Sequence, residues 1–200
     1  MSDVHIGDQL ASVDSSGSVV YSPVLLFLDR DAQEERNFVV LSTGNGTQLT
    51  LTPSHLIYTI SDNQLDPSEQ SEAQLIATFA HRVQIDDWII TVDSEGRSRR
   101  QRVLDVGVSH QTGVFAPLTE QGTLVVDHVV VSCYAVVDDQ RLAHLAFAPV
   151  RLWTRFCQST GWCSRPAAHS STSKTLGIHW YAQFLYSIAR IMLPSHLVYN

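Results

Sequence analysis

The sequence predicts an all-β domain built from two similar halves and followed by a short helical tail. Three observations lead to this prediction. Short apolar runs rich in Val, Ile, Leu and Thr alternate with Gly, Asn, Asp and Ser turn signals over residues 7–137. A layout of turn and apolar residues recurs after a shift of 79 positions. Beyond Cys133 the apolar residues are spaced three and four apart, which is typical of helices.

The strands are expected where the apolar runs lie. We predict them at residues 19–27, 38–41, 48–51, 88–92, 123–126 and 129–137, because each run is short and bounded by turn residues. Helical periodicity is weak throughout these segments. The basic run at 97–102 follows a turn signal, and we interpret it as a solvated hairpin arm.

The internal repeat links two strand-turn-strand units. Six residues recur with the 79-residue shift, among them Asp8 with Asp87 and Gly17 with Gly96. The turn at 46–47 and its following strand have a counterpart at 122–123. A β unit duplicated about a pseudo-two-fold axis would explain both echoes, because two half-covered sheets can bury each other. The simpler alternative is that Asp-Ser-x-Gly is a common hairpin turn.

The tail is predicted to hold two helices, at about 141–156 and 177–193, so that residues 1–138 and 139–200 form separate regions. The first helix is interrupted or restarted at Pro149, and Pro194 ends the second. The small polar residues at 159–174 indicate a linker or a disordered loop. The apolar and aromatic positions of the tail fit either a lipid or membrane surface, or two helices that cap the β domain.

Composition excludes several classes of protein. The net charge of -7 and the absence of a large basic cluster argue against a nucleic-acid partner. No run of 18 uncharged apolar residues is present, and residues 1–9 lack the regions of a signal peptide. The cysteines at 133, 157 and 163 form no pair of CxxC clusters, so we expect no metal site.

Thr52 and His55 form the strongest local constellation. A hydroxyl and an imidazole three residues apart can converge on one carbonyl, polarise a peptide bond and protonate the leaving amine. The TxxH pattern alone is weak, since a histidine at a strand end is more often structural. Cys133 lies on an apolar strand, where a buried inert thiol is the default expectation.

Seven short motifs, in order along the chain, resemble the carboxy-terminal autoprocessing (Hint) domain of hedgehog proteins, with the vertebrate type and Indian hedgehog in particular looking most similar. They are GD at 7–8, FLDRD at 27–31, TPSHL at 52–56, FAPLT at 115–119 with GT at 122–123, SCYAV at 132–136, AFAP at 146–149 and GIHWY at 177–181. This resemblance implies the duplicated β fold shared with inteins, in agreement with the internal repeat, and a sterol-recognition tail.

The resemblance also implies a reaction. In that family a cysteine thiol attacks the preceding glycine carbonyl in an N-to-S acyl shift, and the hydroxyl of cholesterol, a co-substrate, then displaces the thioester. By matching position, Thr52 and His55 would activate the scissile amide, and His55 would protonate the departing amine. Asp29 would be the general base for the sterol hydroxyl, although an aspartate beside a charged turn is equally a turn residue or ion-pair partner. Cys133 would have an auxiliary redox role, with a disulfide to the nucleophile as one form.

The family's nucleophile has no counterpart among the three cysteines. The resemblance places it at the start of a strand upstream of the turn at 7–8, and six residues precede that turn here. We therefore expect an N-terminally truncated domain that lacks its first strand and cannot process itself. No further cofactor is implied. The implied partners are cholesterol, the N-terminal signalling domain of the precursor and, through the tail, a membrane surface.

Other readings stay open at this point. A non-catalytic sterol- or membrane-binding module would use the tail and no chemistry, and a cysteine hydrolase would pair Cys133 with His55. Sterol contact is expected from the aromatic residues of the second helix, Trp180, Tyr181, Phe184 and Tyr186. Packing of that cluster on the β domain is the alternative. The resemblance implies the secretory pathway, with the endoplasmic reticulum lumen, membrane association or secretion as the setting.

Overall fold

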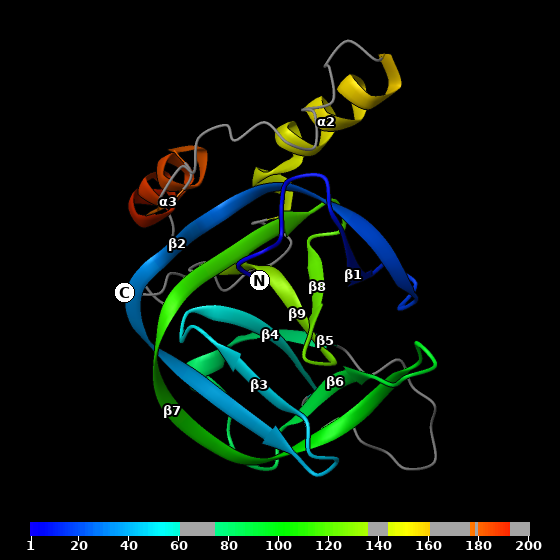
Figure 1. The fold of residues 1–200 in the computed structure, drawn as a ribbon, viewed down its shortest axis with the longest axis vertical. Helices are drawn as coiled ribbons and strands as arrows, with labels where there is room; N and C mark the ends of the chain where they lie inside the picture. Colours follow the sequence, from blue (N-terminus) through cyan, green and yellow to red (C-terminus); the bar gives the residue numbers. More distant parts are fainter. Residues whose placement is uncertain (61–74, 136–143, 161–176, 179, 193–200) are drawn as a thin grey trace.

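The computed structural model describes residues 1–60, 75–135, 144–160, 177–178 and 180–192. It is built mainly of strands, which confirms the predicted all-β class (Figure 1). The elements in chain order are β1 (Gln9–Val13), β2 (Val19–Thr43), β3 (Gln48–Leu51), β4 (His55–Ile60), β5 (Leu75–Phe79), the 3-10 turn η2 (Ala80–Arg82), β6 (Trp88–Val92), β7 (Ser98–Thr119), β8 (Thr123–Val126), β9 (Val129–Ala135), α2 (Ala148–Thr160), β10 (Gly177–Ile178) and α3 (Trp180–Met192).

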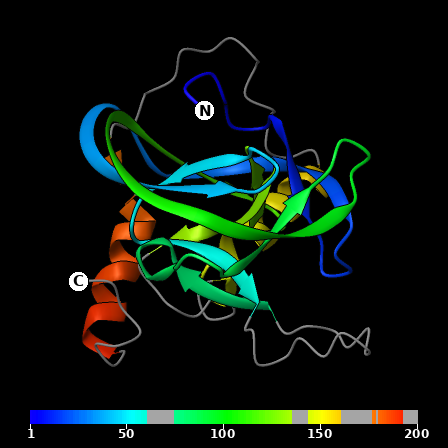
Figure 2. The same ribbon diagram turned by 90° about the horizontal axis from the view of Figure 1, so that it is seen from below.

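The described strands pair antiparallel in one continuous sheet. The order is β1-β2-β7-β6-β4-β9-β8, with β3 and β10 added to β2 and with β5 added to β4. The long strands β2 and β7 arch together around the shorter ones (Figures 1 and 2). The enclosed core is aliphatic, and its most buried side chains include Leu41, Leu56, Ile57, Ile89, Val103 and Leu118. This closed arrangement covers apolar faces that a short open sheet would leave in water.

Matching hydrogen bonds make the duplication visible. Val24 accepts from Gly7 and donates to Asp8 in one half, while Val103 accepts from Asp86 and donates to Asp87 in the other, at N···O distances of 2.8 to 2.9 Å. The shift is 79 residues in both pairs. The two hairpin turns also correspond, since Gly17 (φ +82°) and Gly96 (φ +76°) each close a turn in the left-handed region. Common turn chemistry alone would not repeat the bonds to the flanking strands.

Two sequence-derived boundaries need correction. The runs at 19–27 and 38–41 belong to a single strand, β2, which continues through the charged residues between them. Asp29 therefore lies inside a strand and not at its end. The tail helix α2 spans Ala148–Thr160 and so ends four residues beyond the predicted 156, while Pro149 stands in its first turn, where a missing N–H is tolerated. Of the predicted stretch before it, residues 144–146 are helical and residues 141–143 lie outside the described part of the chain. Helix α3 spans Trp180–Met192, inside the predicted 177–193. The predicted linker lies largely outside the described residues.

Candidate active site

Thr52 and His55 are placed by the tight connection between β3 and β4. Residue Leu51 ends β3 and His55 begins β4, and the His55 N–H donates to the Thr52 carbonyl at 3.0 Å. The carbonyl of Pro53 in this turn accepts from the backbone N–H of His81 at 3.1 Å. Thr52 and His55 both line one cavity of about 180 Å³. The structure thus brings the two residues to a common space.

The His55 imidazole is held in one orientation by β9. Its Nε2 lies 2.8 Å from the carbonyl oxygen of Ser132, and a carbonyl can only accept, so Nε2 carries the proton. The other ring nitrogen, Nδ1, is then the lone-pair nitrogen of the neutral ring. Burial lowers the pKa of His55, and the Ser132 carbonyl opposes that shift by stabilising the charged ring. A neutral imidazole at pH 7 can accept a proton at Nδ1 and later return it.

Cys133 directly follows Ser132 and lines the same cavity. Its side chain is 1% exposed, and its Sγ lies 3.4 Å from the Thr119 hydroxyl oxygen. Burial raises the pKa of the Cys133 thiol to about 11, which outweighs the opposing hydrogen bonds from Thr119. Roughly one molecule in ten thousand would carry a thiolate there at pH 7. This environment argues against the cysteine hydrolase interpretation.

Asp29 reaches the cavity from β2. One carboxylate oxygen, Oδ2, lies 3.1 Å from Arg36 Nη1, and the side chain is 13% exposed. Burial raises the pKa of Asp29, and the positive charge of Arg36 opposes that shift. A hydrogen bond from the backbone N–H of Arg30 also lowers the pKa of Asp29, by less than the charge of Arg36 does. The second oxygen, Oδ1, is buried and has no partner at hydrogen-bond geometry within the described part of the chain.

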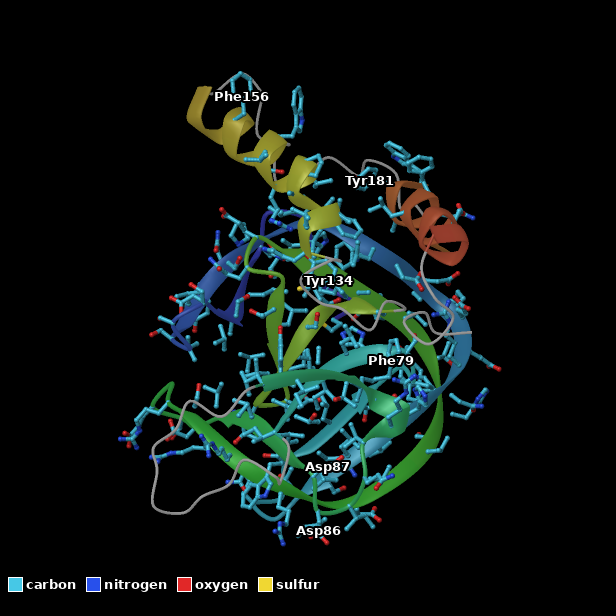
Figure 3. The ribbon with its side chains drawn as sticks, turned by 180° about the vertical axis from the view of Figure 1, so that it is seen from behind. Phe79, Asp86, Asp87, Tyr134, Phe156 and Tyr181 are labelled. Atoms are coloured by element: carbon cyan, nitrogen blue, oxygen red, sulfur yellow. The ribbon has the colours of Figure 1, made fainter. Side chains whose placement is uncertain are left out.

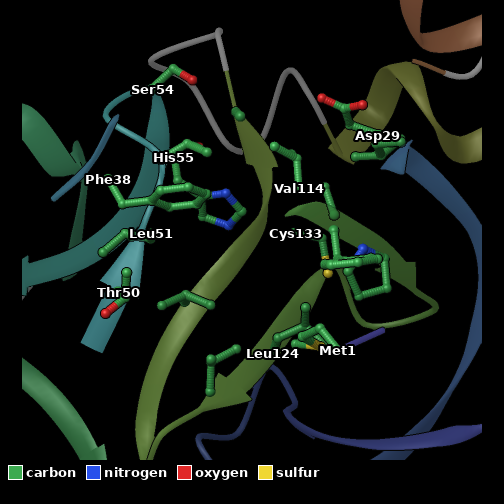
Figure 4. A pocket seen from close by; sticks show the side chains of 18 of the residues that line it. Met1, Asp29, Phe38, Thr50, Leu51, Ser54, His55, Val114, Leu124 and Cys133 are labelled. Carbon is green, nitrogen blue, oxygen red and sulfur yellow. The ribbon is translucent and has the colours of Figure 1, made fainter. Parts of the chain in front are cut away.

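The four residues singled out in the sequence for chemistry meet around one cavity. Asp29 comes from β2, His55 from the start of β4 and Cys133 from β9 (Figure 4). Thr52 lies in the connection between β3 and β4 and lines the same cavity. Their expected roles stay predictions, because no substrate is present. Arg36 also lines the cavity, and it was not among the residues predicted from the sequence. Among the described residues, no three His, Cys, Asp or Glu side chains are grouped so that they could hold a metal ion.

The tail residues expected to contact sterol face different surroundings. The Tyr181 hydroxyl donates to the Ala146 carbonyl at 2.9 Å, and its ring packs edge-on against Phe147 at 5.5 Å. Tyr181 therefore packs inward toward the β domain (Figure 3). Trp180 and Phe184 are 71% and 56% exposed. The side chain of Tyr186 lies outside the described part of the structure. Helix α3 thus uses one face for packing and presents aromatic rings on another.

Two backbone strands connect the tail to the cavity. In the pairing of β10 with β2, Ile178 lies opposite Asp29. Helix α3 begins two residues later. Within the described residues, neither α2 nor α3 has the length and apolarity of a membrane-crossing helix. The tail therefore re-enters the sheet beside the residue expected to activate the sterol.

Comparison with known proteins gives this arrangement a family. The profile of the Hint module matches residues 1–194. The chain belongs to the Hint module family. Protein hedgehog of Drosophila yakuba is 40% identical to this Hint domain over 203 residues, which are 98% of this chain and 41% of that protein. The Sonic hedgehog protein of Danio rerio is 34% identical over 198 residues, with coverage of 98% and 46%.

The relatives are longer than this Hint domain, which spans about two fifths of the length of the curated proteins it matches. The predicted hedgehog family is confirmed, whereas the vertebrate type and the likeness to Indian hedgehog stay predictions. Solved inteins are also similar. An intein from a hyperthermophile has a TM-score of 0.48 and 14% identity over 62% of this chain and 70% of its own. The Ssp DnaB mini-intein variant M86 has a TM-score of 0.49 and 10% identity, with coverage of 64% and 77%.

Proposed function

We propose that this Hint domain catalyses autoprocessing of a hedgehog precursor by an N-to-S acyl shift followed by transfer of the acyl group to cholesterol. The observation that carries the proposal is the cavity shared by His55, Thr52 and Asp29. A proton-accepting imidazole and a buried carboxylate are the two groups that the two steps require. The product would be a signalling domain with an ester-linked sterol.

In the first step a cysteine sulfur attacks the carbonyl carbon of the residue before it. The C–S bond forms and the C–N bond breaks, and the departing amine must gain a proton. Thr52 polarises the scissile amide through its hydroxyl, and His55 supplies the proton to the nitrogen after receiving one from the attacking thiol at Nδ1. Both groups lie at the β3–β4 connection, so one rigid turn sets their spacing.

The attacking thiol must belong to the residue that follows the scissile carbonyl. The cysteines of this chain stand at 133, 157 and 163, none of them at such a junction. We propose that Cys133 acts as a redox partner of the junction cysteine. The reactive thiol would come from a junction joined to the amino-terminal side of this Hint domain.

The experiment restores that junction. A precursor carrying a signalling domain, a Gly-Cys junction and the first strand ahead of this chain should cleave when cholesterol is added. Replacing His55 with alanine should abolish cleavage. The matched control is His110→Ala, because His110 is exposed on β7 and lies outside the cavity. A precursor that does not cleave under any condition, or one that cleaves equally well without His55, would remove the proposal.

Cholesterol would be the acceptor in the second step. Asp29 would accept the proton of the sterol hydroxyl as its oxygen attacks the thioester carbon, and the C–S bond would then break. The exposed rings of Trp180 and Phe184 would contact the sterol, whereas Tyr181 would hold the helix in place. Changing Trp180 or Phe184 to serine should lower cholesterol-dependent cleavage without altering cleavage by a small thiol. Equal losses with both acceptors would rule out sterol contact at these rings.

A membrane surface is a second candidate partner, and the exposed apolar side chains of α2 support it. Leu152, Trp153 and Phe156 of this helix are 63%, 64% and 50% exposed, and the helix contains no acidic residue. Figure 3 shows Phe156 on α2, away from the β domain. A non-catalytic sterol- or membrane-binding module would need only this tail. We propose a secretory location, in the endoplasmic reticulum lumen, at a membrane or secreted. Vesicle flotation of Trp153→Ser against the unchanged chain tests membrane contact.

A further inference from the structure

Asp29 and Arg36 are close in space although they are far apart along one strand. Residues seven apart on a straight strand are separated by about 23 Å, yet the Arg36 guanidinium lies 3.1 Å from the Asp29 carboxylate. The strand must therefore bend between them. This bend is unusual because both residues belong to β2, whose backbone stays paired with β7 on either side.

A bulge produces the bend. Asp31 pairs with Val114 and Glu35 pairs with Thr112, so residues 32–34 of β2 oppose the single residue Gly113 of β7. The Asp31 carboxylate accepts the backbone N–H groups of residues 33 and 34 at 2.8 and 3.2 Å, which fixes the turn of the chain. Gly113 has φ +100°, a conformation that side chains rarely adopt. The bulge is thus built from both strands.

Arg36 is held in place from its other side by Glu34. The Glu34 carboxylate accepts from Nε and Nη2 of Arg36 at 2.7 and 2.8 Å, which is the two-point contact that a planar guanidinium favours. This contact leaves Nη1 for Asp29. The guanidinium therefore has a defined plane, and its position in turn defines which oxygen of Asp29 is engaged.

Each carboxylate oxygen of Asp29 has a different environment as a result. Oδ2 is occupied by Arg36, while Oδ1 is buried and lacks a hydrogen-bond partner among the residues described. A buried unpaired acceptor costs free energy, so such atoms are rare in folded proteins unless a ligand uses them. Asp29 and Arg36 both line the cavity that also contains His55.

We propose that Arg36 is a positioning residue for the acyl transfer step, holding Asp29 by Oδ2 so that Oδ1 faces the acceptor hydroxyl. The inference rests on the proposed function. In the step, the hydroxyl proton passes to Oδ1, the hydroxyl oxygen bonds to the thioester carbon, and the sulfur leaves as a thiolate that takes up the proton. Arg36 touches none of the reacting atoms. Its charge also opposes the rise in the pKa of Asp29 that burial causes, and so favours the ionised carboxylate, the form in which a base can accept a proton.

The test uses the precursor with the restored junction and compares two acceptors. A small thiol cleaves the thioester by exchange and needs no base for a hydroxyl, whereas cholesterol does. Arg36→Gln should leave thiol-induced cleavage unchanged and lower cholesterol-dependent cleavage increasingly as the pH falls, by up to about tenfold for each unit by which the pKa of Asp29 rises, because the ionised fraction falls tenfold per unit below the pKa. The loss should shrink as the pH rises, and Arg36→Lys should restore part of the activity.

Two further variants keep the inference falsifiable. Arg97→Gln removes another ion-paired arginine, on a hairpin outside the cavity, and should leave both reactions unchanged. In an Asp29→Asn background, Arg36→Gln should add no further loss, since both changes remove one interaction. An Arg36→Gln precursor with the unchanged pH profile, or with equal losses for both acceptors, overturns the positioning role. If the precursor without substitutions cleaves neither with cholesterol nor with the thiol, the proposed function itself is refuted.

Discussion

Replacing Phe147 with alanine should detach the tail while the strands stay folded. Phe147 is 3% exposed, and its ring stacks on Tyr134 of β9 at 5.6 Å and meets Tyr181 of α3 edge-on at 5.5 Å. Removing a buried phenylalanine side chain typically costs about 3–5 kcal/mol. Because this ring lies between the strand and the helix, most of that cost should fall on their contact.

The tail also contacts the strands through the pairing of β10 with β2, through the buried Ala182 of α3 and through two hydrogen bonds. Tyr134 binds His144 at 2.9 Å and accepts from Arg151 at 3.1 Å, and each such hydrogen bond contributes about 1 kcal/mol net. A loss of about 3–5 kcal/mol corresponds to roughly a 100- to 4000-fold change in the docking equilibrium, since about 1.4 kcal/mol is tenfold. Together the two hydrogen bonds contribute about 2 kcal/mol, which is less than that loss.

Amide hydrogen exchange measures the outcome. In Phe147→Ala the amides of α3 should exchange far faster, while those of β9 keep their protection. The control is Trp153→Ala, because Trp153 is 64% exposed and its loss should change stability by no more than about 0.5 kcal/mol. Unchanged protection of α3 in Phe147→Ala, or equal loss of protection in β9, would refute this account of docking.

Three more predictions follow from the same contacts. Gly17→Ala and Gly96→Ala should each lower the free energy of unfolding by about 1–2 kcal/mol, and by similar amounts, because an added Cβ meets nothing within 4 Å but both φ angles are positive. Chemical denaturation measures both losses, and clearly unequal losses would contradict the equivalence of the two turns. Below about pH 6.5 the unfolding free energy should fall, since burial lowers the pKa of His55 and of His144 and only the unfolded chain takes up those protons. The unfolding free energy should change by at most about 1.4 kcal/mol per pH unit for each histidine. His144→Gln should reduce this slope, as measured by denaturant titrations at several pH values. An unaltered slope would contradict the burial of the His144 ring. Finally, Cys133 should resist alkylation at pH 7 until the protein unfolds, because its thiol pKa is raised to about 11 by burial. Rapid labelling of the folded protein would contradict the burial of this thiol.

Local patterns predicted the short strands because each ends in its own turn. Strands β3, β6 and β8 have the expected bounds, with turn residues at their ends. The middle of β2 was missed because its charged residues resemble a loop. Their backbone is paired with β7, where Asn37 lies opposite His110, 73 positions away in the chain. Such a pairing between distant residues cannot be predicted from local sequence.

Some residues of the candidate site could be predicted from the sequence and others could not. Thr52 and His55 are near neighbours in sequence, so their convergence on one cavity could be proposed from the chain alone. Asp29 was selected by resemblance, since a charged run gives no reason to expect a buried carboxylate. Arg36 gave no signal, because its approach to Asp29 depends on a bulge opposite Gly113. Contacts that depend on such a bend become visible only in three dimensions.

The mass of the released amino-terminal fragment is the most direct test of the account. With the junction restored and cholesterol supplied, the fragment should gain the mass of one sterol joined through an ester. The Asp29→Asn precursor should release fragment only when a thiol is added, and then without that gain. A fragment that always has the mass of the unmodified polypeptide would contradict the assignment of this cavity to sterol transfer.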